Sequence, residues 1–218
     1  GTMHPGIWLA FGDLSGRDYW RNKSRVDHRK FLQDPKGGQG VGSFVEEKVY
    51  RDGDGGSICS ERFRCVFHVR PLGYLIEWDS TFESDREFVF GDQEEMGLGI
   101  RVANPIMGNK GGRLLDSEGR IGEAEVWGNA AQWCDYAGTL EGKHVGMTLL
   151  AHPDNFGSSW LHARDYGFVA MNPFGREAMK KGPRSRIVVK AGETLRLRDG
   201  ILLHSSEKPG DLSQAYEE

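Results

Sequence analysis

Residues able to do chemistry are concentrated in the stretch from Trp133 to Phe174. Four motifs in it combine aromatic rings with Arg, Asp, Asn and His side chains: Trp-Cys-Asp-Tyr, His-Pro-Asp-Asn, Trp-Leu-His-Ala-Arg-Asp-Tyr-Gly and Asn-Pro-Phe. Aromatic rings stack on the apolar faces of a sugar, while charged and amide groups bind its hydroxyls. The stretch therefore predicts a site for a polyhydroxylated ligand. Taken singly, each aromatic residue also suits a hydrophobic core, and each Asn or Asp suits a turn.

Three rings of this stretch are expected to form a stacking wall, and two polar side chains are expected to bind hydroxyls. One histidine near each end of the chain would add a further wall to the site. The predicted substrate-binding residues are Trp133, Trp160, Tyr166, Asp135, Asn155, His4 and His204. Taken alone, the two histidines are also typical of packed strand edges.

Acid–base chemistry is assigned to a histidine and a carboxylate that lie far apart in the sequence. His152 ends a strand-like run and precedes a proline, a position suited to a general acid or base. Glu95 precedes a run that carries Arg101, and we expect Glu95 to be the carboxylate partner of His152. Arg101 and Arg164 are expected to hold oxygen atoms of the substrate. A turn-capping histidine and a solvated acidic turn with a salt-bridged arginine are the alternatives.

No resident metal or other cofactor is predicted. His152 and His162 are ten residues apart, which is not a recognised ligand spacing, so a metal site would need the fold to bring His4 or His204 to His152. The three cysteines lack Cys-x-x-Cys spacing and are expected to be reduced thiols in the core. The net charge is −4 and no basic stripe is present, which argues against nucleic-acid binding. No apolar run reaches the roughly 20 residues of a membrane span.

These side chains must be positioned mainly by β-strands. Residues 63–69 and 74–82 alternate between apolar and polar types, which places one set on each face of a sheet, and Pro71-Leu72-Gly73 indicates a hairpin turn between them. Further predicted strands are Phe44–Tyr50, Glu87–Phe90, Leu98–Ala103, Val145–Ala151, Phe168–Met171, Arg186–Lys190 and Thr194–Leu203. The last of these is expected to break at Asp199-Gly200.

Helical signals are few, because only Asp27–Gln33 and Gly175–Lys181 suit one or two turns. About ten strands in a chain of this size must close on themselves, since an open sheet leaves unpaired edges and one bare face. Residues 1–218 are therefore expected to form one all-β domain, a large antiparallel β-sandwich with few short helices.

The order of the motifs along nearly the whole chain resembles that of the PmoA-like family of bacterial proteins, a domain of unknown function. The motifs begin with His-Pro-Gly-Ile-Trp, pass through Gly-Leu-Gly-Ile-Arg-Val-Ala and the four motifs above, and end with Leu-Arg-Leu-Arg-Asp-Gly-Ile-Leu-Leu-His. The resemblance implies a β-supersandwich similar to that of aldose mutarotases and a role in carbohydrate catabolism beside sugar dehydrogenases. It does not imply methane oxidation, because the chain has no membrane span and no copper-type cluster. Members usually carry further strands before the motif that contains His4, so we expect either that N-terminal strands are missing here or that the sandwich is completed differently.

The sequence as a whole predicts a carbohydrate-processing enzyme that acts on a sugar or an oxidised glycoside by acid–base chemistry, as an epimerase, mutarotase or lyase. A non-catalytic carbohydrate-binding module would have the same aromatic residues without an acid–base pair at one ligand atom. A metal-dependent sugar enzyme is the third hypothesis. The predicted partner is a small sugar ligand, and the protein is expected to be soluble, either cytoplasmic or, where a leader has been removed, periplasmic.

Overall fold

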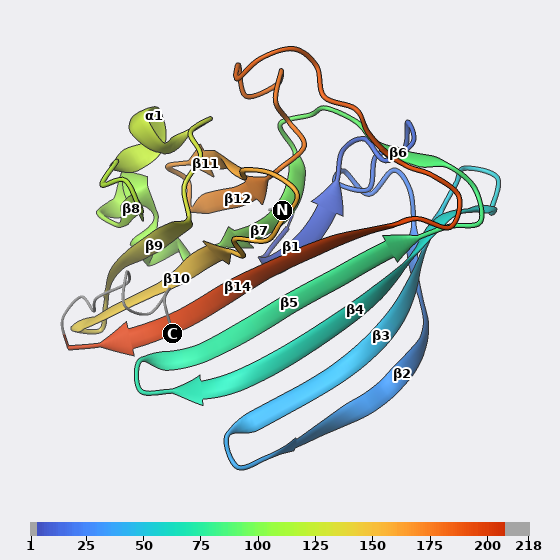
Figure 1. Ribbon diagram of the computed structural model, residues 1–218. Coiled ribbons are helices and arrows are strands. Elements are labelled where there is room, and N and C mark those ends of the chain that lie inside the picture. Colours follow the sequence, from blue (N-terminus) through green and yellow to red (C-terminus); the bar gives the residue numbers. More distant parts are fainter. Residues whose placement is uncertain (1–3, 208–218) are drawn as a thin grey trace.

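A computed structural model of the 218-residue chain describes residues 4–207 and confirms an all-β antiparallel sandwich (Figure 1). Its main layer is a curved eight-stranded sheet. In spatial order this sheet contains β2 (Val26–Gly38), β3 (Val41–Arg51), β4 (Ser57–Arg70), β5 (Gly73–Glu83), β14 (Thr194–Ser206), β10 (Lys143–Ala151), β9 (Trp133–Leu140) and β8 (Arg113–Asp116).

A four-stranded antiparallel sheet packs over part of this layer. In spatial order it contains β1 (Gly6–Phe11), β7 (Met96–Arg101), β12 (Phe168–Asn172) and β11 (Trp160–Arg164). A third, two-stranded sheet pairs β6 (Phe88–Phe90) with β13 (Ile187–Val189). The helical elements of residues 4–207 are short: α1 (Gly122–Val126) and the 3₁₀ turns η1 (Asn104–Ile106) and η2 (Gly108–Lys110).

The core lies between the eight-stranded and four-stranded sheets because strand alternation points one apolar set of each sheet at the other. Phe63 of β4 and Ile76 of β5 belong to the same buried cluster as Ile100 of β7 and Val169 of β12. The three cysteines are free and buried, as expected. Burial of the Cys65 thiol raises its pKa to about 12, so it stays protonated at neutral pH.

Three local predictions are wrong. Asp27–Gln33 lies in β2 rather than in a helix, because hydrogen bonding to β3 satisfies its backbone groups. This strand lies at the edge of the sheet and is mostly exposed on both faces, so its residues do not alternate in polarity. Gly175–Lys181 forms hydrogen-bonded turns, not a helix. Asp199-Gly200 does not interrupt β14, which pairs without a break with β5 and β10 on either side.

Candidate functional site

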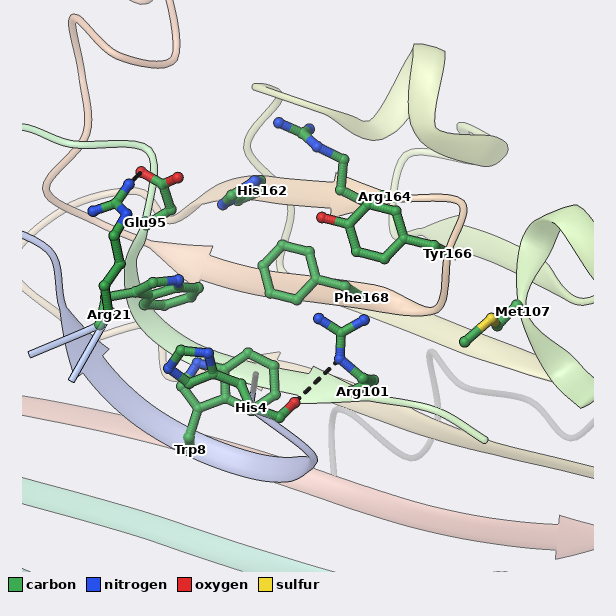
Figure 2. A pocket seen from close by; sticks show the side chains of 11 residues that line it. His4, Trp8, Arg21, Glu95, Arg101, Met107, His162, Arg164, Tyr166 and Phe168 are labelled. Atoms are coloured by element: carbon green, nitrogen blue, oxygen red, sulfur yellow. Dashed lines mark hydrogen bonds and ion pairs between the residues drawn. The ribbon is translucent and has the colours of Figure 1, made fainter. Parts of the chain in front are cut away.

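A cavity of about 580 Å³ lies against the face of the four-stranded sheet that points away from the core (Figure 2). Ile100 and Val169 point into the core. Because successive side chains of a strand point to opposite faces, Arg101 and Phe168 point outward, and both line the cavity. The floor of the site is therefore built on the sheet, while loops and turns supply His4, Trp20, Arg21, Glu95, Met107 and Tyr166.

The floor of the cavity is kept low by small residues. Trp8, Gly99, Ala170 and His162 are successive register partners in one row across β1, β7, β12 and β11. A Cβ atom on Gly99 would lie 2.5 Å from Cζ2 of Trp8, so only glycine allows the indole to fold over the sheet. The two small residues leave a depression between the Trp8 and His162 side chains.

Aromatic rings form the walls of this depression. The Trp8 ring is stacked on Phe168 with 5.7 Å between centroids, and Tyr166 is stacked on the same Phe168 at 6.3 Å. The His4 ring packs against Trp8 at 4.9 Å and against Trp20 at 5.0 Å. Burial lowers the pKa of His4, and the neighbouring Arg101 charge lowers it further, so the ring is neutral at pH 7.

Glu94 ties three side chains together beside the cavity. Its Oε1 atom accepts hydrogen bonds from Trp127 Nε1 at 2.6 Å and from the Arg164 guanidinium, and Arg164 is also 3.7 Å from Glu123. Burial alone would raise the pKa of Glu94, but the contacts with His162, Trp127 and Arg164 outweigh burial and lower it. Glu94 is therefore an anion that holds these groups in place.

His162 is the least satisfied polar side chain of the site. It is 4% exposed, and neither ring nitrogen has a hydrogen-bond partner among residues 4–207. Its Nε2 atom lies 3.2 Å from Glu94 Oε1, but the direction of the contact is not that of a hydrogen bond. Burial lowers the pKa of His162 to about 4, with Glu94 opposing and Arg164 reinforcing the shift, so the imidazole is neutral at pH 7.

Five of the residues predicted from the sequence line this cavity: His4, Glu95, Arg101, Arg164 and Tyr166. Glu95 pairs with Arg21 at 2.8 Å (Figure 2). These five come from separate parts of the chain, and the four-stranded sheet with its adjoining loops brings them together.

His152 does not join Glu95 in this cavity. It lines a second cavity, of about 670 Å³, together with Arg64, Asp79 and Arg198, which lie on strands of the eight-stranded sheet. The proposed pairing of His152 with Glu95 therefore has no support from the geometry, because the end of β10 belongs to the other sheet. The arginines of this second cavity are paired with carboxylates, as in the Arg196–Asp79 pair at 2.7 Å, and Asp199 accepts a hydrogen bond from Asn155 at 3.4 Å.

Three further predicted residues have contacts of a structural kind. Asn155 exchanges two 2.8 Å hydrogen bonds with the backbone of Arg198 and so fastens its loop to β14. Trp133 packs with Leu150 and Leu202 on the outer face of the eight-stranded sheet. Trp160 is half-buried at the start of β11 and does not line the cavity.

Asp135 and His204 do meet, but away from the cavity. His204 Nε2 lies 2.8 Å from Asp135 Oδ1, and Thr148 Oγ1 donates to the same oxygen at 2.8 Å. Both predicted residues are at least nine-tenths buried. Adjacent strands β9, β10 and β14 bring the three side chains to one face.

Sequence reasoning gave too little weight to His162 and to the N-terminal aromatic residues Trp8 and Trp20. The signal was present, since both Trp residues stand in the motifs near His4. It was ambiguous because tryptophans at a strand and at a turn are equally typical of a core. Glu94, next to the predicted Glu95, was also overlooked as the partner of Arg164.

No group of three or more His, Cys, Asp or Glu side chains among residues 4–207 is placed to hold a metal ion. Within the same range, every helix is too short or too polar to cross a bilayer.

Comparison with solved structures gives distant likenesses. A galactose mutarotase related enzyme from Lactobacillus acidophilus is 10% identical with a TM-score of 0.37, over 82% of this chain and 72% of that one. A protein described as a kojibiose phosphorylase from the human microbiome is 9% identical with a TM-score of 0.42, over 89% of this chain and 23% of that one. The α-galactosidase AgaB from Geobacillus stearothermophilus is 9% identical with a TM-score of 0.40, over 93% and 30%. At these values the likenesses carry no argument about activity.

No curated protein matches the sequence. A family model matches residues 2–216, nearly the whole chain. The description of that family gives neither an activity nor the PmoA name. The chain belongs to the family of unknown function DUF6807.

Proposed function

We propose that the protein is a carbohydrate-processing enzyme of the epimerase or lyase type, and that its substrate binds in the cavity between Trp8 and His162. The observation that carries the proposal is the imidazole of His162, which is buried, neutral and without a hydrogen bond although Glu94 lies 3.2 Å away, in a cavity walled by aromatic rings. An unsatisfied buried polar group costs about 1–3 kcal/mol. A ligand that hydrogen bonds to the ring would recover this free energy.

The walls of the cavity suit a sugar. The partly exposed Trp8 and Tyr166 rings offer flat apolar faces, and the Phe168 ring, which is 3% exposed, packs against both. Charged groups lie around them, so hydroxyls at the edge of a stacked sugar find hydrogen-bond partners. The Trp20 ring lies nearly parallel to the His162 imidazole, with 6.4 Å between centroids. Because the His162 nitrogens are enclosed by neighbouring side chains, we expect Trp20 to shift when a substrate reaches them.

Glu95 is the base of the proposed reaction. Its carboxylate lies in the cavity wall and is held by Arg21 at 2.8 Å. It would remove the proton from a sugar carbon next to a carbonyl group: the C–H bond breaks, the proton passes to the carboxylate, and negative charge develops on the carbonyl oxygen. The proton then returns to carbon, or a leaving group departs from the neighbouring carbon.

His162 is the electrophilic partner of this base. A neutral imidazole donates one N–H, and in a buried site such a donor stabilises a developing oxyanion without having to be charged. The low pKa of His162 is consistent with this role and unsuited to that of a proton acceptor at pH 7. Glu94, through Arg164 and the 3.2 Å contact with the imidazole, would set the position of the ring.

Proton transfer is tested by solvent exchange. The protein is incubated in D₂O with pairs of hexoses and hexuronates, and deuterium at carbon is followed by NMR. Exchange is expected with at least one sugar, and Glu95→Gln should slow it by a factor of about 10² or more. Glu87→Gln is the matched control, since this carboxylate is exposed and outside the cavity. A sugar that binds without exchange or turnover would overturn the enzymatic proposal and leave a carbohydrate-binding module.

A further inference from the structure

We propose that the ligand of this cavity is an acidic sugar, and that Arg101 binds its carboxylate. The inference rests on the proposed function in that it takes the cavity to be a sugar site. It adds a chemical class, the hexuronates and related sugar acids, and assigns one residue to the recognition of the acid group.

Charge balance within the cavity singles out Arg101. Three arginines line the cavity. Arg21 is neutralised by Asp18 at 3.1 Å and by Glu95 at 2.8 Å, and Arg164 is neutralised by Glu94. No carboxylate of residues 4–207 lies within ion-pair distance of Arg101. Among residues 4–207, Arg101 is therefore the arginine of the cavity without an ion pair, and its guanidinium is the place where an anion is favoured.

The Arg101 guanidinium is also held in place. Its Nε atom donates to the backbone carbonyl of His4 at 3.1 Å, and Figure 2 shows its two terminal nitrogens on the side away from that bond. The guanidinium carbon is 5.3 Å from the centroid of the Tyr166 ring and 5.6 Å from that of Phe168. A planar cation fixed by one hydrogen bond and two rings keeps its paired donors free for the two oxygens of a carboxylate.

A second, independent observation points to a ligand between Arg101 and His162. Both the indole nitrogen of Trp8 and the ring nitrogens of His162 are buried without a hydrogen-bond partner among the residues that the structure describes. These groups stand in the row that forms the cavity floor, next to the row that contains Arg101. A polyhydroxylated molecule would satisfy them, whereas a simple inorganic anion would satisfy only Arg101.

The spacing suits one sugar residue. Arg101 and His162 are two strands apart and two residues apart along the strands, by way of the pairs Arg101–Phe168 and Ala170–His162. Sheet geometry therefore puts their Cα atoms about 12 Å apart. The Phe168 ring packs against both side chains, with its centroid 4.6 Å from that of His162 and 5.6 Å from the Arg101 guanidinium carbon. A ligand that contacts both side chains must therefore span this ring, which a monosaccharide with a carboxylate at one end is long enough to do.

Calorimetric titration with paired ligands tests the assignment. Each pair is a hexose and its hexuronate: glucose with glucuronate, galactose with galacturonate, and mannose with mannuronate. At least one hexuronate is expected to bind ten-fold or more tightly than its neutral partner, and added salt should reduce the preference. Arg101→Met should abolish the preference, and Arg101→Lys should restore only part of it, because an ammonium lacks the paired donors.

The control variant is Arg29→Met, which removes the same charge at an exposed ion pair on the edge strand β2. It should keep the preference, and thermal melting should show that both methionine variants fold. Equal binding of hexose and hexuronate would overturn the carboxylate assignment while leaving the sugar site intact. Equal binding of lactate and hexuronate would retain Arg101 as an anion site and overturn the sugar site. No binding by any member of the panel would overturn both.

Discussion

Replacement of His162 by Gln is expected to flatten the dependence of stability on pH. Burial lowers the pKa of His162 from 6.5 to about 4 in the folded protein. Because the folded pKa lies below the unfolded one, the unfolded chain takes up this proton first as the pH falls. The contribution of neutral His162 is therefore complete above pH 7, decreases between pH 6.5 and 4, and is lost below pH 4.

The size of this effect follows from the shift. One pKa unit corresponds to about 1.4 kcal/mol, so the difference between 6.5 and about 4 amounts to roughly 3 kcal/mol in total. At pH 5, where most exposed carboxylates are still ionised, the loss relative to pH 7.5 is about 2 kcal/mol. We expect the wild-type protein to show this loss in its free energy of unfolding and the Gln variant to lack it.

Urea denaturation at pH 7.5, 6.5, 5.5 and 5.0 measures the free energy of unfolding of both proteins. The difference between them, rather than either curve alone, isolates His162 from other groups that titrate in this range. His152→Gln removes a histidine that is partly exposed and outside the cavity, and it is expected to retain the wild-type loss. If the His162 variant loses as much stability as the wild type between pH 7.5 and 5.0, then the imidazole is not held neutral by burial and its proposed role falls.

Three further substitutions test the packing and electrostatics of the fold. Gly97→Ala should reduce the free energy of unfolding by roughly 3 kcal/mol, because the φ angle of Gly97 is +101° and the new Cβ would lie 1.8 Å from the Met171 carbonyl oxygen. Urea denaturation measures this loss. Glu61→Ala should cost roughly 3–5 kcal/mol, because it leaves Lys48, now 3.3 Å from the buried carboxylate, without its counter-charge and the Tyr50 and Ser80 hydroxyls without their acceptor. Lys48→Met with Glu61→Leu should recover only the part of the loss that is due to the unpaired charge. Burial raises the pKa of Asp199 to about 7, so Asp199→Asn should stabilise the protein by roughly 1–2 kcal/mol at pH 8 and by little at pH 4 in melts at the two values. This expected stabilisation is smaller than the whole pKa shift of Asp199 would give, because the side chain is partly exposed and water screens its charge.

The strands of the core could be recognised from the sequence because each carries its own signal. Residues 63–69 and 74–82 alternate in polarity, and they pair as neighbours in β4 and β5. Strand β2 could not be recognised, because an edge strand exposed on both faces has no such period and is specified by its partner β3. Four further strands, β1, β8, β9 and β11, were not predicted either. Three of them, β1, β8 and β11, have only six, four and five residues, too few for a period to stand out. The fourth, β9, is buried on both faces from Trp133 to Ala137, so its residue types do not alternate.

The residues of the site were harder to assign than the strands. Glu95, Arg101, Arg164 and Tyr166 were identified by residue type and local motif, and all of them line the cavity. His152 and His162 have equally suggestive contexts in the sequence. They differ in which sheet their strand joins: β10 joins the eight-stranded sheet and β11 the four-stranded sheet.

By itself the sequence determined the fold class, the order of most strands and the kinds of side chain available for a sugar site. These properties are encoded locally, in the alternation of residue types and in short motifs. Only the tertiary structure decided which side chains share a cavity, which arginine of that cavity has no ion pair among residues 4–207, and which histidine is buried enough to be neutral. Those properties depend on contacts between strands distant in the chain, such as the Trp8–Gly99 and His162–Ala170 pairs, and no local pattern specifies them.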